Sequence, residues 1–236
     1  MAPLTMQERQ HILDQYKGLR VADVRDGLDW LLLHDIGTMT PDIKPLFRTR
    51  IAGFARTYRY VPYTGDIPQM TPEEYGTWAY DYYYKEVAPV LPGMEEELQD
   101  DDVVVVDADD IDAGLIGSNS GLWMLATGAR GVITSGGIRD TDECLLNKIP
   151  CWFKLTSQKM NQGRIQYEDR NIPITVGGVH VRPDDFVVAD GDGVIVVPRE
   201  HILDVALWAN REMTNDKAGR RRAYERLGMP LDETVS

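Results

Sequence analysis

Apolar residues recur along the chain with two spacings, one typical of helices and one typical of strands. Helical spacing predicts helices over residues 6–17, 21–33 and 201–227. Another helix is expected to begin at Pro72, with Thr71 as its N-cap. Short apolar runs predict strands over residues 51–61, 103–106, 151–153, 174–176, 179–181, 186–189 and 194–197. The pattern favours one α/β domain over residues 1–236, with a mixed sheet, N-terminal helices and a long C-terminal helix.

The strongest strand signal is a run of four valines, Val103–Val106. Such a run indicates a strand buried on both faces of an α/β sheet. Ligands of open α/β folds gather beyond the C-terminal ends of strands. Four acids follow the run: Asp107, Asp109, Asp110 and Asp112. One of them could therefore help to bind a metal, although a solvated acidic turn is the better explanation for most of them.

Residues 117–140 form a stretch in which the pattern changes several times. A loop of small residues, 117–121, precedes apolar positions at helical spacing from Leu122 to Ala129. A short apolar run at 132–133 predicts a strand, and Gly136-Gly137 predicts a turn before the pair Arg139-Asp140. The stretch therefore places small residues, a helix start and a charged pair close together in the chain.

These features suggest a site for a small anion. A helix start has unpaired N–H groups that suit a carboxylate or phosphate. Arg139 could hold a planar anion through two parallel hydrogen bonds, and Asp140 is a ligand suited to Mg²⁺. The alternative is an ordinary turn that ends in a surface ion pair, which contributes little to stability.

Composition and charge exclude several classes of partner. The chain has 236 residues and a formal net charge of −13, so it repels nucleic acid unless a basic face is segregated. The one dense basic cluster, residues 220–222, lies near the end of the predicted C-terminal helix. It suits the helix dipole or a subunit contact. No apolar run approaches a membrane span and no signal peptide is evident at the start, so we expect a cytoplasmic protein.

Other candidate chemistry is weaker. Cys144 and Cys151 are too few for a disulfide framework and are expected to be buried free thiols. The four histidines show no zinc-type spacing. The aromatic segment 78–84 could form a wall for an aromatic substrate, but a core or subunit contact is the more common use of such residues.

Several segments of the chain resemble the regulator of ribonuclease activity A family, and they follow one another in the same order as in that family. This family includes the 4-hydroxy-4-methyl-2-oxoglutarate/4-carboxy-4-hydroxy-2-oxoadipate aldolases. The resemblance covers roughly residues 21–200 and rests on segments 26–28, 103–107, 117–140, 176–179, 183–185 and 189–198. It implies a three-layer α/β/α fold of the swivelling, phosphohistidine-domain type. It also implies homotrimers or homohexamers with active sites between subunits.

The same resemblance implies a lyase that depends on Mg²⁺ or Mn²⁺. Such an enzyme cleaves or decarboxylates a small 2-oxo acid to pyruvate through a metal-stabilised enolate. Asp140 matches the metal-binding aspartate and Arg139 the substrate-holding arginine, and both would be catalytic. Further substrate contacts would come from Gly114, Leu115, Ile116, Gly117, Ser118, Asn119 and Lys159.

The sequence departs from these aldolases at one position. They carry an acidic residue directly after the matched Gly117, where this chain has Ser118. A serine hydroxyl is no base near neutral pH without activation. Decarboxylation is less affected, because loss of CO₂ needs no base to begin. Candidates to replace the acid are Asp107, Asp109, Asp110 or a carboxylate from a neighbouring subunit.

Two functions of different classes remain open from the sequence. One is the metal-dependent lyase just described. The other is a non-enzymatic regulatory protein, like the family members that inhibit ribonuclease E, although the retained Arg139-Asp140 pair argues against it. A methyltransferase is not supported, because no glycine-rich nucleotide loop follows an early strand.

Overall fold

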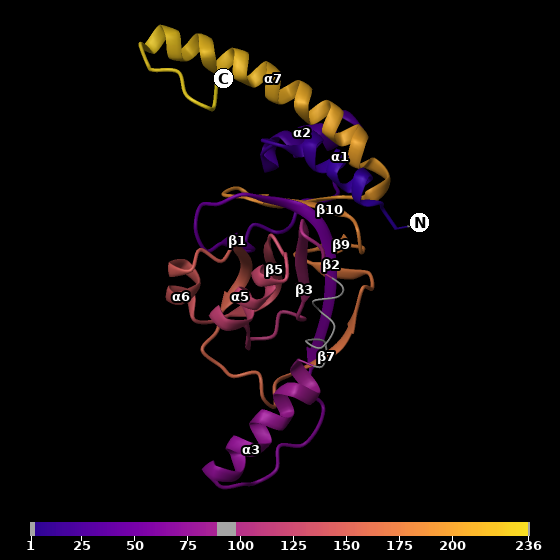
Figure 1. Ribbon diagram of the computed structural model, residues 1–236, viewed down its shortest axis with the longest axis vertical. Helices are drawn as coiled ribbons and strands as arrows, with labels where there is room; N and C mark the ends of the chain where they lie inside the picture. The colour runs from indigo at the N-terminus through magenta and orange to yellow at the C-terminus, as the bar shows by residue number, and fades with distance from the viewer. Residues whose placement is uncertain (1–2, 89–97, 236) are drawn as a thin grey trace.

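The computed structural model describes residues 3–88 and 98–235. Figure 1 shows a curved sheet with helices at both ends and along one side. Its helices are α1 (Met6–Tyr16), α2 (Val21–Trp30), α3 (Pro72–Tyr82), α5 (Ser118–Ala126), α6 (Thr141–Leu146) and α7 (Ile202–Leu227). A π-helical turn, Tyr83–Val87, follows α3, and a 3₁₀ turn, Arg199–His201, precedes α7.

The main sheet has nine strands in a mixed arrangement. They are β1 (Lys44–Pro45), β2 (Ile51–Pro62), β3 (Asp102–Asp107), β4 (Gly114–Ile116), β5 (Gly131–Ile138), β6 (Cys151–Thr156), β7 (Ile165–Arg170), β10 (Phe186–Asp190) and β11 (Gly193–Val197). The separate hairpin consists of β8 (Ile174–Val176) and β9 (Val179–Val181), joined by Gly177-Gly178 as predicted.

Strand order in the main sheet is β1-β6-β5-β3-β2-β10-β11, with β4 paired to β5 and β7 to β2. Strands β2, β3, β5 and β6 run parallel, whereas β1, β7, β10 and β11 pair antiparallel to their neighbours. The outermost strands β1 and β11 come back together, so the sheet is nearly closed. The prediction of an α/β fold with a mixed sheet is confirmed.

Side chains of β3 alternate between two cores, as the valine run predicts. Val104 and Val106 pack with the cluster beneath α5 and the π-helical turn, and Val103 and Val105 pack inside the curve of the sheet. All four are buried. A parallel strand with both faces covered needs apolar residues at every position, which explains the run.

A third core lies between the sheet and a cap of three helices. Helices α1, α2 and the first half of α7 cover β2, β10 and β11, with Phe54 and Phe186 in edge-to-face contact beneath them. Figure 1 shows α7 continuing past the body of the protein and the C-terminal tail folding back beside it. The predicted long C-terminal helix is confirmed, since α7 spans Ile202–Leu227 and ends at Gly228 in the left-handed conformation.

Two predicted helix boundaries were wrong. The helix from residue 21 ends at Trp30 rather than Leu33, because Leu32 adopts a left-handed conformation and the N–H of Leu33 donates to the carbonyl of Leu28. The helix expected to start at Leu122 starts at Ser118, so most of the small-residue loop is its first turn.

The predicted glycine turn before Arg139 was also wrong. Gly136 and Gly137 lie inside β5. A Cβ at position 136 would lie 2.6 Å from the Cβ of Ala108, and one at 137 would lie 2.5 Å from the carbonyl oxygen of Ala113. These glycines therefore allow close packing of a neighbouring segment and do not reverse the chain.

Several smaller predictions can also be compared with the structure. Both cysteines are buried and free, as predicted. In the aromatic segment Tyr82 is buried, Trp78 packs against the core, and Tyr80 and Tyr84 are exposed. Within the described residues, no helix is both long and apolar enough to cross a bilayer.

Candidate active site

A small cleft lies at the C-terminal ends of β4 and β5, where the predicted site residues meet. It has a volume of about 220 Å³. Gly114, Leu115, Gly117, Asn119, Arg139 and Asp140 all line it, whereas Ile116 is buried in β4 behind it. Drug-sized ligands occupy roughly 300–1,000 Å³, so the cleft suits a smaller molecule.

Asp140 is the N-cap residue of α6 and adopts a left-handed conformation with φ of 54°. An aspartate tolerates this conformation better than most residues, and such positions are common at functional sites. The Asp140 side chain is 39% exposed. Its Oδ2 accepts hydrogen bonds from the backbone N–H of Ser118, at 3.3 Å, and from Ser118 Oγ, at 3.4 Å.

Arg139 is fixed through its backbone, because its N–H donates to the carbonyl of Ile116 at 2.9 Å. Its Nε lies 3.7 Å from Oδ1 of Asp140, and its side chain is 41% exposed. At that distance the guanidinium keeps most of its donors for another partner. Adjacent residues thus present a cation and a carboxylate to one cleft.

Two glycines make room for this charged pair. A Cβ at position 114 would lie 2.7 Å from Cδ of Arg139, and a Cβ at position 117 would lie 2.7 Å from Oδ2 of Asp140. Both side chains therefore rest directly on glycine backbone. This contact explains the glycines without requiring a left-handed conformation at either position.

Gly117→Ala tests this packing. The backbone of Gly117 has φ of −132°, which alanine adopts readily, so the fold should be kept. The new methyl group would displace the Asp140 carboxylate, and we expect Mn²⁺ affinity to fall by about 10–100-fold, as for other changes that reorient a ligand. Gly76→Ala, where a Cβ meets no atom within 4 Å, should leave that affinity unchanged. Calorimetric titration of Mn²⁺ measures both.

Most N–H groups of the predicted anion-binding segment already have partners. Gly114 donates to the carbonyl of Lys159, Leu115 to that of Ala113, Gly117 to Ser120 Oγ and Ser118 to Asp140. Among the described residues, Asn119 and Ser120 keep open N–H groups in the first turn of α5. An anion in the cleft would therefore be held by these two donors.

Lys159 and the acids after β3 lie to the side of the cleft. The Lys159 ammonium pairs with Asp112, and this hydrogen bond is the main cause that lowers the pKa of Asp112. Asp110 pairs with Lys154, and Asp107 accepts from the N–H of Asp109. None of these side chains lines the cleft.

Two lining residues carry chemistry that sequence reasoning missed. Tyr83 reaches the cleft from the π-helical turn, and no described residue forms a hydrogen bond with its hydroxyl. Asn161 lines the cleft with a buried side-chain amide oxygen that has no hydrogen-bond partner among the described residues. π-Helical turns often mark functional sites, and an orphaned buried amide points to an absent polar ligand.

The donor set fits a hard divalent cation. Among the described residues, no three or more histidine, cysteine, aspartate or glutamate side chains gather in one place. A structural zinc site needs such a group. Mg²⁺ is commonly held by one or two carboxylates, with water and substrate oxygens as its other ligands. The carboxylate of Asp140 can therefore be the single protein ligand of such an ion.

Comparison with known proteins supports the resemblance seen in the sequence. A family model described as RraA-like, aldolase/RraA, matches residues 21–196. The chain belongs to this family.

Relatives extend the RraA-like match over most of the chain. A protein from Halalkalibacterium halodurans is 28% identical over 215 residues, which cover 89% of this chain and 87% of the relative. One from Deinococcus radiodurans is 36% identical over 100 residues, which cover 42% of this chain and 61% of the relative, less than two thirds of its length. Both carry provisional names as 4-hydroxy-4-methyl-2-oxoglutarate aldolases.

A solved structure supports the RraA-like fold. Streptomyces coelicolor RraAS2, described as an unusual member of the RNase ES inhibitor RraA protein family, aligns with a TM-score of 0.70 at 22% identity. The alignment covers 93% of this chain and 98% of that chain. At this identity the likeness concerns the fold.

Proposed function

We propose that this protein is a divalent-metal-dependent carbon–carbon lyase that acts on a small 2-oxo acid. The observation that carries the proposal is the cleft in which Arg139, Asp140 and two open N–H groups of α5 meet. Mg²⁺ or Mn²⁺ held at Asp140 would supply Lewis-acid charge to the 2-oxo group. The size of the cleft and the names of the relatives both agree with a substrate of this class.

Each side chain then has a defined part in the reaction. The N–H groups of Asn119 and Ser120 bind the substrate carboxylate at the start of α5. When the C–C bond breaks, its electron pair stays on the pyruvate fragment as an enolate, and Arg139 stabilises the developing negative charge. The Asn161 amide orients the substrate through the group that lacks a partner in the protein.

Ser118 does not serve as the base, because its hydroxyl donates to the Asp140 carboxylate. Decarboxylation therefore suits this site better than aldol cleavage, since it leaves CO₂ and an enolate without removing a hydroxyl proton. The enolate must still be protonated. We assign this proton donor to Tyr83, which lines the same cleft.

The surroundings of Tyr83 keep it protonated. Burial, and after it the neighbouring Tyr84, raise the pKa of the Tyr83 phenol, while Arg139 lowers it in part. Because the net shift is upward from the ordinary tyrosine value of about 10, the phenol is neutral throughout the physiological range. We expect no alkaline loss of activity from this group below that value.

Tyr83→Phe should lower kcat by about 100-fold, which is the lower end of the effect of a lost general acid. Mn²⁺ affinity should be unchanged, because the phenol does not contact Asp140 through any hydrogen bond in the structure. Tyr84→Phe is the matched control, since Tyr84 is the next residue and is half exposed. Equal activity of Y83F and wild type would remove Tyr83 from the mechanism.

A binding experiment tests the proposal without a known substrate. Oxalate resembles the planar, doubly anionic form of a pyruvate enolate. We expect calorimetry to show oxalate binding when Mn²⁺ is present and little binding without it. Protein that bound neither Mn²⁺ nor oxalate would contradict the proposed activity.

From the family resemblance we further propose a homotrimer or homohexamer with active sites between subunits, in which the domain has the swivelling architecture. A carboxylate from a neighbouring subunit would then be available to replace the acid absent at Ser118. Sedimentation velocity on the purified chain measures the assembly directly. A monomer at micromolar concentration would contradict this arrangement.

A further inference from the structure

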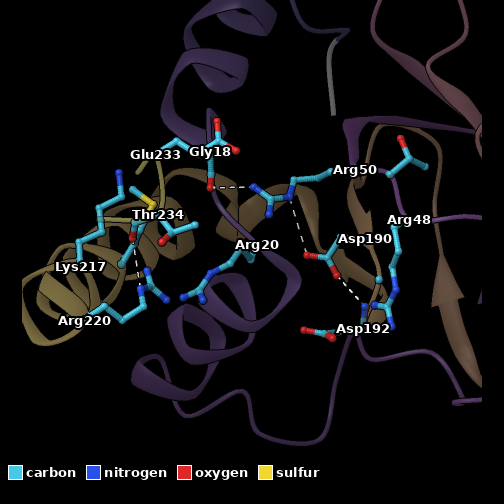
Figure 2. A pocket seen from close by; sticks show the side chains of 13 residues that line it. Gly18, Arg20, Arg48, Arg50, Asp190, Asp192, Lys217, Arg220, Glu233 and Thr234 are labelled. Atoms are coloured by element: carbon cyan, nitrogen blue, oxygen red, sulfur yellow. Dashed lines mark hydrogen bonds and ion pairs between the residues drawn. The ribbon is translucent and has the colours of Figure 1, made fainter. Parts of the chain in front are cut away.

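A second cavity lies at the other end of the sheet, far from the candidate active site. Its volume is about 660 Å³. Strands β2, β3 and β5 are parallel, and the cavity adjoins the start of β2 at Arg50, whereas Arg139 and Asp140 follow the end of β5. Figure 2 shows side chains from the α1–α2 connection, the segment before β2, the β10–β11 turn, α7 and the C-terminal tail around it.

This cavity is basic in a chain that is strongly acidic. Five basic and three acidic side chains line it, although the whole chain has a net charge of −13. Arg20 is paired with Asp23 and Asp216, so four cations remain beside three carboxylates, an excess of one positive charge. The five basic residues are Arg20, Arg48, Arg50, Lys217 and Arg220. They come from segments up to 200 residues apart, so only the fold assembles them. A local excess of this sign attracts anions.

Arg48 is the cation most open to a ligand. No described residue forms a hydrogen bond or ion pair with its side chain, and its guanidinium lies over Gly191, where a Cβ would be 2.0 Å from Nη1. Arg50 donates to the carbonyl of Gly18 at 3.1 Å, and its Nε is 3.9 Å from Asp190 Oδ2. Arg20, in contrast, is fully engaged by Asp23 and Asp216.

The nearest acid, Asp190, is shared between Arg50 and two backbone N–H groups. Asp190 is almost buried, and both of its oxygens accept backbone N–H groups, from Asp192 at 2.9 Å and from Val21 at 3.0 Å. Its carboxylate therefore holds the β10–β11 turn against the start of α2. Arg48 and Arg50 lie on either side of Asp190 in Figure 2, with Lys217 and Arg220 on the opposite wall.

Two acidic residues at the cavity, Asp192 and Glu233, indicate that the ligand carries hydroxyl groups as well as a negative charge. Asp192 and Glu233 line the cavity, and no described residue forms a hydrogen bond or ion pair with either carboxylate. A carboxylate accepts hydrogen bonds from hydroxyl groups, whereas Arg48 and Arg50 suit a phosphate through bidentate contacts. The cavity volume is within the range of roughly 300–1,000 Å³ for small-molecule sites.

We propose that this cavity binds a small phosphorylated polyol, with its phosphate on Arg48 and Arg50 and its hydroxyls toward Asp192 and Glu233. The site also gives Arg220 a role that the basic cluster at residues 220–222 did not reveal. Its Nε donates to the carbonyl of Thr234 at 3.2 Å, which holds the C-terminal tail over the cavity. The arrangement depends on no residue of the candidate active site.

Calorimetry with ribose 5-phosphate as the probe tests this site. We expect ribose 5-phosphate to bind, inorganic phosphate to compete with it, and ribose to bind at least tenfold more weakly. Arg48→Gln should weaken ribose 5-phosphate by about tenfold or more, since a charge-assisted hydrogen bond is lost. Added NaCl should weaken binding as well.

Two further variants serve as controls for this experiment. Arg222→Gln removes the same charge from an exposed position on α7 outside the cavity and should bind the probe as wild type does. Asp140→Asn should also bind it normally, because the candidate active site lies at the opposite end of the sheet. The proposal is overturned if wild type binds no ribose 5-phosphate, if ribose binds equally well, or if R48Q and R222Q behave alike.

Discussion

Replacing Asp140 with asparagine is expected to lower kcat/KM for a 2-oxo acid by about 10²–10³-fold, the loss typical of removing one preorganised electrostatic group. Asparagine keeps the shape of the side chain, and its amide oxygen can still accept the N–H of Ser118. The fold should therefore survive. The variant loses the negative charge that a hard divalent cation needs, so Mn²⁺ affinity should fall with the activity.

Asp142→Asn is the matched control for this prediction. Asp142 lies two residues further on, in the exposed first turn of α6. The same change of charge there should alter kcat/KM by less than about twofold, since exposed charges are well screened. Steady-state kinetics and circular dichroism on D140N and D142N would separate a lost ligand from a damaged fold. Equal activity of the two variants would remove Asp140 from the mechanism.

The largest expected effect on stability is at Asp102, at the start of β3. Its carboxylate is fully buried and accepts from Arg9 Nη2 at 2.6 Å, from Arg56 Nε at 2.8 Å and from the N–H of Gln99 at 2.9 Å. Arg9 comes from α1, and its guanidinium stacks 4.0 Å from the Phe54 ring. This one carboxylate therefore ties the helical cap to the centre of the sheet.

Asp102→Asn should lower the free energy of unfolding by about 3–5 kcal/mol, because it leaves buried guanidinium charge uncompensated. Asp101→Asn is a stringent control, since Asp101 is the adjacent residue and pairs with the half-exposed Arg130. A surface pair of that kind contributes about 0–1 kcal/mol. Urea unfolding of the two variants measures the difference. Similar losses would contradict a stabilising role for the buried network around Asp102.

Local signals in the sequence predicted much of this fold. The valines of β3, the Gly177-Gly178 hairpin and the long helix α7 each depend on neighbouring residues, and each is present. Strands β4 and β7 were not predicted. Residues 114–116 form a strand only because they pair with β5, more than 15 residues away. No local sequence pattern predicts such a pairing.

The candidate site shows the same division. Arg139 and Asp140 are adjacent in the chain, and small residues surround them, so they were found directly. Tyr83 and Asn161 reach the cleft from distant segments through a π-helical turn and a loop. The aromatic run that contains Tyr83 also suits a core, and several of its members are indeed core residues. Only the three-dimensional structure shows that Tyr83, among the residues of this aromatic run, lines the cleft.

The measurement that tests the central claim most directly is oxaloacetate decarboxylation by the purified protein, with EDTA and then with Mg²⁺ or Mn²⁺. This reaction needs a charge that stabilises the enolate but no base to start it, so the serine at position 118 is no obstacle. We expect turnover that requires the metal and is lost in D140N. Wild-type protein that showed no metal-dependent turnover would contradict a lyase site at Arg139 and Asp140 and would favour a regulatory binding protein.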